Sequence, residues 1–195
     1  MALNRIYNLG HRRKRLSLTN YRTRLKLLLS KKTRIVIRKS LNEMTVQLVN
    51  YNREGDKILK SFNSRILKIY NWKYHPGNIP SAYLLGLIVG LESEKINVKE
   101  AILDIGLKQS IKGSALYAAL KGVLDGGLKI PHDKNILPEE DRIKGKHIFD
   151  YYAKLSQDKK IKQFSKYLKN NVNPSNIMKD FEETRLKIIS EYKND

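Results

Sequence analysis

The first 42 residues constrain this chain more than any other stretch, because they hold thirteen Lys or Arg and no Asp or Glu. The first acidic residue is Glu43. Like charges at this density repel one another, so such a segment becomes ordered against a polyanion or stays in solvent. We expect an arm that binds phosphate and leads directly into the first strand of a folded domain. The alternative is a solvated basic tail.

The charge of the chain is polarised toward its N-terminus. The 195 residues include 39 basic and 19 acidic ones, which gives a formal net charge of +20. The first 42 residues supply thirteen of the bases, so residues 43–195 carry 26 bases against 19 acids, or +7. Such a field attracts nucleic acid first and an anionic membrane second. Residues 20–32 are too short for a membrane-surface helix, and we therefore expect no membrane partner.

Composition also bounds the compartment. The chain has no cysteine, which excludes disulfides and cysteine-based zinc sites and fits a reducing compartment. Its basic N-terminus lacks the apolar region of a secretory signal. The longest apolar run, residues 82–91, is far short of the roughly 20 residues that a membrane span needs. These features predict a cytoplasmic protein, and 41% hydrophobic residues are enough for a packed core.

Strand and helix patterns alternate along the chain, which predicts the α/β class. A helix capped by Thr19 or Asn20 leads into three strands that form an antiparallel meander. Gly86 and Gly90 lie on one face of a strongly apolar helix, where they predict close packing on a sheet. The strands are expected at 34–40, 44–51, 57–63 and 99–106, and the helices at 20–29, 64–70, 81–94, 115–125, 138–155, 161–168 and 175–192.

The sequence pattern changes after residue 130 from mixed strands and helices to helices alone, and we divide the chain there. Residues 1–20 are expected to form the basic N-terminal arm, 21–130 an α/β RNA-binding domain, and 131–195 a helical extension. The extension is predicted to pack on the domain or on a partner. Its last helix, expected from about Ser175 to Tyr192, would point Ile177, Phe181, Leu186 and Ile189 inward.

Seven segments in chain order together resemble one known family. They are Tyr21-Arg-Thr-Arg-Leu-Lys-Leu-Leu, Arg34-Ile-Val-Ile-Arg-Lys-Ser, Ile79-Pro-Ser-Ala-Tyr-Leu-Leu-Gly-Leu, Ala101-Ile-Leu-Asp-Ile-Gly-Leu, Lys112-Gly-Ser, Ala119-Leu-Lys-Gly-Val-Leu-Asp-Gly-Gly-Leu-Lys-Ile-Pro-His and Glu140-Asp-Arg-Ile-Lys-Gly-Lys-His. Across about residues 12 to 192, the chain is similar to the archaeal branch of the large-subunit ribosomal protein L-eighteen family, the universal 5S-rRNA-binding protein.

The resemblance implies a mixed α/β domain of the translational-machinery type with a C-terminal helical extension. It implies a structural, non-catalytic protein that binds 5S rRNA and helps attach it to 23S rRNA. Its place would be the central protuberance of the large ribosomal subunit, beside neighbouring ribosomal proteins. Carried over residue by residue, the RNA-binding positions are Arg12, Arg13, Lys14, Arg15, Tyr21, Arg22, Arg24, Lys31, Lys32, Arg34, Arg38 and Lys39, and more loosely Ser64, Arg65, Trp72 and Lys112.

Trp72 has two interpretations. It lies with Tyr70 and Tyr74 in or beside a loop that also carries Lys68 and Lys73. In the first interpretation its ring stacks on an unpaired base, and in the second it fills the domain core.

A metal-dependent nuclease is the alternative class. Asp104 on a buried strand, together with Asp125 or Asp56, would form a two-metal carboxylate site. In the competing interpretation Asp104 accepts hydrogen bonds inside the fold. The four histidines, His11, His75, His132 and His147, show no ligand spacing, and we expect no metal, no cofactor and no enzymatic activity.

Overall fold

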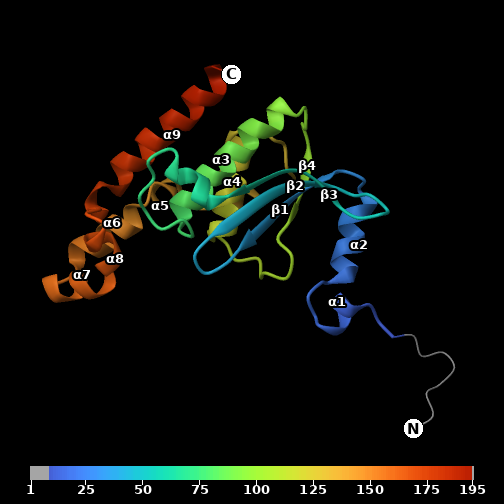
Figure 1. The fold of residues 1–195 in the computed structure, drawn as a ribbon, viewed down its shortest axis with the longest axis horizontal. Helices are drawn as coiled ribbons and strands as arrows, with labels where there is room; N and C mark the ends of the chain where they lie inside the picture. The colour runs from blue at the N-terminus through green and yellow to red at the C-terminus, as the bar shows by residue number, and fades with distance from the viewer. Residues whose placement is uncertain (1–8, 195) are drawn as a thin grey trace, which may run out of the picture.

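A four-stranded mixed sheet organises the computed structural model, which describes residues 9–194 (Figure 1). Residues 1–8 of the expected arm lie outside the described part, as does residue 195. The strand order is β3-β2-β1-β4. The three-stranded meander and the mixed α/β fold are thus confirmed. The strands are β1 (Thr33–Lys39), β2 (Met44–Asn50), β3 (Lys57–Asn63) and β4 (Ala101–Asp104).

The two edge strands of the sheet pair differently because the connections that lead to them differ in length. β1, β2 and β3 pair antiparallel through short turns, whereas β4 pairs parallel with β1. A parallel pair needs a long crossover, which here includes the helix α3 (Ile79–Lys95). The register sets Val36 opposite Asp104, and because the two strands are parallel, their carboxyl ends lie at the same end of the sheet.

Side-chain alternation along β1 separates an apolar face from a basic face. Ile35 and Ile37 are fully buried in the main hydrophobic cluster. Arg34 and Arg38 alternate with them and therefore lie on the opposite face. Figure 1 shows α3 and its neighbour α4 (Ala115–Asp125) on one side of the sheet, and the N-terminal helices on the other.

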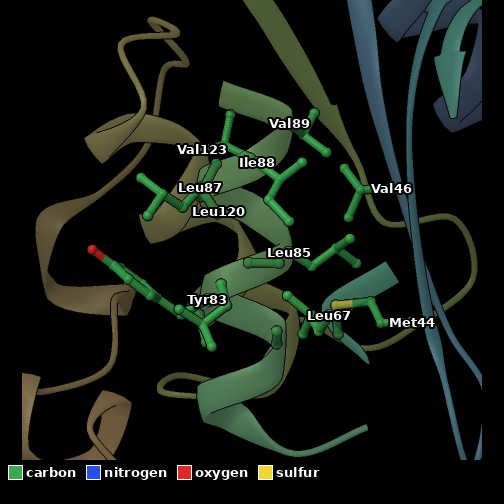
Figure 2. Packing of buried hydrophobic residues seen from close by; sticks show 14 of the residues in the cluster. Met44, Val46, Leu67, Tyr83, Leu85, Leu87, Ile88, Val89, Leu120 and Val123 are labelled. Carbon is green, nitrogen blue, oxygen red and sulfur yellow. The ribbon is translucent and has the colours of Figure 1, made fainter. Parts of the chain in front are cut away.

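The core lies between the sheet and α3, with α4 packed behind. Figure 2 shows Met44 and Val46 of β2 facing Leu85 and Ile88 of α3. α3 begins two residues earlier than expected, since its cap is Asn78, whose Oδ1 accepts the backbone N–H of Ser81 at 2.8 Å. The short helix after β3 is a 3₁₀ helix, η1 (Ser64–Lys68), and Asn63 caps it by accepting the N–H of Arg65.

The glycines of α3 pack against a helix, which corrects the expected helix–sheet contact. A Cβ at Gly86 would lie 2.1 Å from the carbonyl oxygen of Ala119 in α4, and one at Gly90 would lie 2.5 Å from that of Val123. The approach is reciprocal, because a Cβ at Gly122 of α4 would lie 2.1 Å from the carbonyl oxygen of Tyr83. Glycine lets the two backbones meet where any side chain would collide.

The C-terminal part is more broken than its periodicity predicted. The helix expected at 138–155 is divided at Gly145, whose φ is 88°, and the one expected at 161–168 is divided around Phe164. The elements after α4 are η2 (Lys134–Ile136), α5 (Glu140–Ile143), α6 (Lys146–Lys154), α7 (Gln157–Gln163), α8 (Ser165–Lys169), η3 (Pro174–Asn176) and α9 (Ile177–Asn194).

Helix α9 is docked on the domain through α3. Ile177, Phe181 and Ile188 belong to the same hydrophobic cluster as the sheet and α3. Leu186 was expected to face inward, but 65% of it is exposed, and Ile188 takes the inward position. The division at residue 131 stays a prediction, although this shared core ties the extension to the domain.

Phe181→Ala should lower the free energy of unfolding by about 3–5 kcal/mol, because it leaves a cavity where α9 meets α3. Leu186→Ala, on the exposed face of the same helix, should change it by less than about 0.5 kcal/mol. Urea unfolding of both variants measures the difference. Equal, small effects would show that α9 does not contribute to the core.

Candidate nucleic-acid interface

Two short helices precede the sheet: α1 (Arg12–Arg15) lies in the basic arm, and α2 (Tyr21–Leu29) begins the domain. All four side chains of α1 are exposed. Arg13 Nε donates to Thr19 Oγ1 at 2.9 Å, which ties α1 to the linker. Of the two caps expected for α2, Asn20 is used, and its Oδ1 accepts the N–H of Thr23. Among residues 9–194 the bases of α1 make no ion pair, so they are available to an external anion.

Arg34 holds the outer face of the sheet together and is not available to RNA, which corrects its predicted role. Its side chain is 2% exposed. Its Nη2 lies 2.7 Å from Asp56 in the β2–β3 turn, and its Nη1 lies 3.2 Å from Asp104 at the end of β4. A buried guanidinium needs such partners, because an unpaired charge in the interior is strongly unfavourable.

Two more arginines join the same carboxylates but remain partly exposed. Arg24 of α2 donates to both oxygens of Asp56 at 2.9 Å, and Arg38 Nη2 donates to Asp104 Oδ1 at 2.9 Å. Burial favours a raised pKa for Asp56, but hydrogen bonds from Arg34 and Arg24 outweigh it and hold that pKa below its ordinary value. The carboxylate therefore stays charged at neutral pH and fixes α2 against the sheet.

A groove of about 810 Å³ lies between the arm and the carboxyl end of β4. Four basic side chains line it, from α1, α2, β1 and the loop after β4: Arg13, Arg24, Arg38 and Lys108. Its two acids, Asp56 and Asp104, are already bound to arginines. The groove thus presents positive charge from segments far apart in sequence.

Lys108 was missed by the sequence analysis. A signal for it existed, because the carboxyl ends of parallel strands meet at one edge of a sheet, and Lys108 follows β4 closely. The parallel pairing of β1 and β4, however, was not expected from the residues themselves.

Arg22, Lys31, Lys32 and Lys39, which the resemblance also assigns to RNA, do not line this groove. Arg22, Lys31 and Lys32 are exposed, and Lys32 pairs with Glu100. Lys39 is half-buried. Tyr21, at 36% exposure, lies 6.0 Å from the ring of His11 and is the aromatic residue at the base of the arm.

The four loosely assigned positions divide into two buried and two exposed residues. Trp72 is 4% exposed and its Nε1 donates to Ser81 Oγ at 2.7 Å, so it is a core residue and does not stack on RNA. Ser64 is also buried, with its Oγ accepting the N–H of Met44. Arg65 is exposed and pairs with Glu43, and Lys112 is exposed before α4.

The carboxylates of the nuclease alternative serve the fold. Asp104 accepts hydrogen bonds from Arg34, Arg38 and the N–H of Gly106, as the competing interpretation predicted. Asp125 accepts from Tyr83 and Lys121. Within residues 9–194 no three His, Asp or Glu side chains gather as metal ligands. In that same range no helix is long and apolar enough to cross a membrane.

Comparison with known proteins defines the class as ribosomal. A family model described as "Ribosomal large subunit proteins 60S L5, and 50S L18" matches residues 5–98 and 90–133. The "Large ribosomal subunit protein uL18" of Methanococcus maripaludis is 45% identical over 192 residues, covering 97% of this chain and 100% of that protein. The chain belongs to this family of large-subunit ribosomal proteins, in its archaeal form.

Family membership confirms several expectations. The chain is a structural protein of the large ribosomal subunit and not an enzyme, and it works in the cytoplasm. Its partners are those of the ribosome, namely rRNA and other ribosomal proteins.

Arg34→Met should lower the free energy of unfolding by about 3–5 kcal/mol, because it leaves Asp56 and Asp104 without their shared buried counter-charge. Arg22→Met, at an exposed position of α2, should change it by less than about 0.5 kcal/mol. Chemical denaturation at neutral pH measures both. An Arg34→Met variant as stable as the parent would show that the network does not hold the sheet face.

Proposed function

We propose that this chain binds 5S rRNA and helps attach it to 23S rRNA in the central protuberance. The observation that carries the proposal is the continuous basic surface made by α1, α2 and the groove at the end of β4. The family of large-subunit proteins to which the chain belongs supports a partner of rRNA. The finer assignment to 5S rRNA rests on the resemblance described above.

The chemistry of the surface suits RNA. Exposed Lys and Arg displace the counterions condensed on phosphates, which provides affinity without base reading. The groove accepts a backbone that passes between Arg13 of the arm and Lys108 of the loop. Tyr21 replaces Trp72 as the aromatic side chain that stacks on an unpaired base.

Residues 131–195 have a different role in this proposal. They carry the helices that pack on α3 on the side of the sheet away from the arm (Figure 1). We assign them to docking on neighbouring ribosomal proteins more than to 5S recognition. The N-terminal arm and the outer face of the sheet remain for RNA.

Converting Arg12, Arg13, Lys14 and Arg15 to Ala should flatten the slope of log affinity against log salt for 5S rRNA by about three. Each neutralised phosphate contributes about −0.7 to −0.9 to that slope, so four lost contacts give a change of this size. The measurement is a salt titration of 5S rRNA binding by the full chain.

A matched variant replaces four exposed lysines of the extension, Lys134, Lys154, Lys179 and Lys187, with Ala. It removes the same charge but should leave the slope nearly unchanged, because these residues lie outside the proposed surface. Equal slopes in the parent and the α1 variant would mean that α1 stays in solvent and does not contact phosphate. Equal flattening in both variants would mean that only net charge matters.

A further inference from the structure

A second groove lies at the opposite end of the molecule from the arm. Its volume is about 750 Å³, and it runs between the segment from η1 to the loop before α3 on one side and α7–α8 on the other. The groove at the end of β4 shares no lining residue with it, although three of the loosely assigned positions, Ser64, Arg65 and Trp72, line this second groove.

The floor of this groove is aromatic and is held by contacts within the chain. Trp72, Tyr74 and Tyr167 form a chain of ring contacts, with centroids 4.9 and 5.8 Å apart, and Phe164 continues it at 5.9 Å. Tyr167 Oη accepts the backbone N–H of His75 at 3.0 Å, which ties α8 to the opposite wall. The floor is therefore formed without a ligand.

The rim is basic and lacks acids. Arg65, Lys68, Lys73 and Lys166 line the groove, and no Asp or Glu does. Among the described residues Lys68, Lys73 and Lys166 form no ion pair within 4 Å, whereas Arg65 pairs with Glu43. Burial first, and then the nearby charges of Lys39 and Lys166, lower the pKa of His75 at this wall.

We propose that this groove docks an acidic segment of another large-subunit protein, with an apolar side chain on the aromatic floor and flanking carboxylates on Lys68, Lys73 and Lys166. Charge complementarity selects the occupant, since the rim offers only cations. The apolar floor favours an inserted side chain over a nucleotide. Trp72 and Tyr74 are 4% exposed and Phe164 is 8% exposed, so no open ring face is offered to a base, and the half-buried Tyr167 provides the aromatic surface that an inserted side chain contacts.

Carbodiimide cross-linking tests the proposal directly, because the reagent joins lysine amines only to carboxylates in contact. Large subunits that contain the full chain are isolated, treated and digested, and the linked peptides are identified by mass spectrometry. We expect Lys68, Lys73 or Lys166 to be linked to Asp or Glu of one other subunit protein, close in sequence to a large apolar residue.

A charge-reversed pair provides the matched comparison. Lys68→Glu with Lys166→Glu should abolish the links, including those from Lys73, and lower the occupancy of the linked protein in the subunit. Lys159→Glu with Lys162→Glu changes the same charge on exposed positions of α7 that do not line the groove, and should keep them. Equal melting temperatures of the free variants establish that both fold.

Three outcomes would overturn the proposal. The first is the absence of links from the rim in subunits that contain the chain in full amount. The second is linkage only to carboxylates of this chain itself. The third is an adduct to rRNA from a photoreactive residue placed at Asn170 in the groove, which would assign the site to RNA. None of these depends on 5S binding, so the function proposed for the arm is tested separately.

Discussion

The buried guanidinium of Arg34 is the interaction on which the arrangement of this protein depends. It lies between Asp56 and Asp104, at 2.7 and 3.2 Å, and so joins the β2–β3 turn to the end of β4 across the outer face of β1. Each carboxylate then holds a second arginine, Arg24 from α2 or Arg38 from β1. A single buried cation thus determines where two strand ends and one helix meet, because neither acid can be left unpaired there.

This network places positive charge without neutralising it. Its two acids hold three arginines, so the cluster is net cationic, and Arg24 and Arg38 both line the groove beside the arm. The arm has no acids of its own, and α2 is held to the turn by Arg24. The RNA surface proposed here therefore combines exposed bases on α1 with anchored bases on the sheet. The second groove, between η1 and α7–α8, combines lysines with an aromatic floor, and we propose a protein partner for it.

Local patterns predicted most of the elements, and long-range contacts account for the errors. Alternation in residues 34–63 was enough to predict the meander, because one face of each strand had to be apolar. Periodicity did not reveal that Gly86 and Gly90 face α4, since spacing on one helix does not identify its neighbour. Composition along the arm predicted a basic surface for RNA, which stays a prediction, but it did not indicate that Arg34 and Trp72 are buried. Their burial depends on Asp56, Asp104 and Ser81, which are distant partners that charge and loop position do not indicate.

The central claim is that the arm and the end of β4 form one RNA surface, positioned by the Arg34 network. Amide hydrogen exchange of the full chain, free and bound to 5S rRNA, tests it most directly. We predict that bound RNA slows exchange in residues 12–29 and also in residues 105–108, which are distant in sequence but share one groove. Slowed exchange confined to residues 131–194, with the arm and residues 105–108 unchanged, would contradict the account.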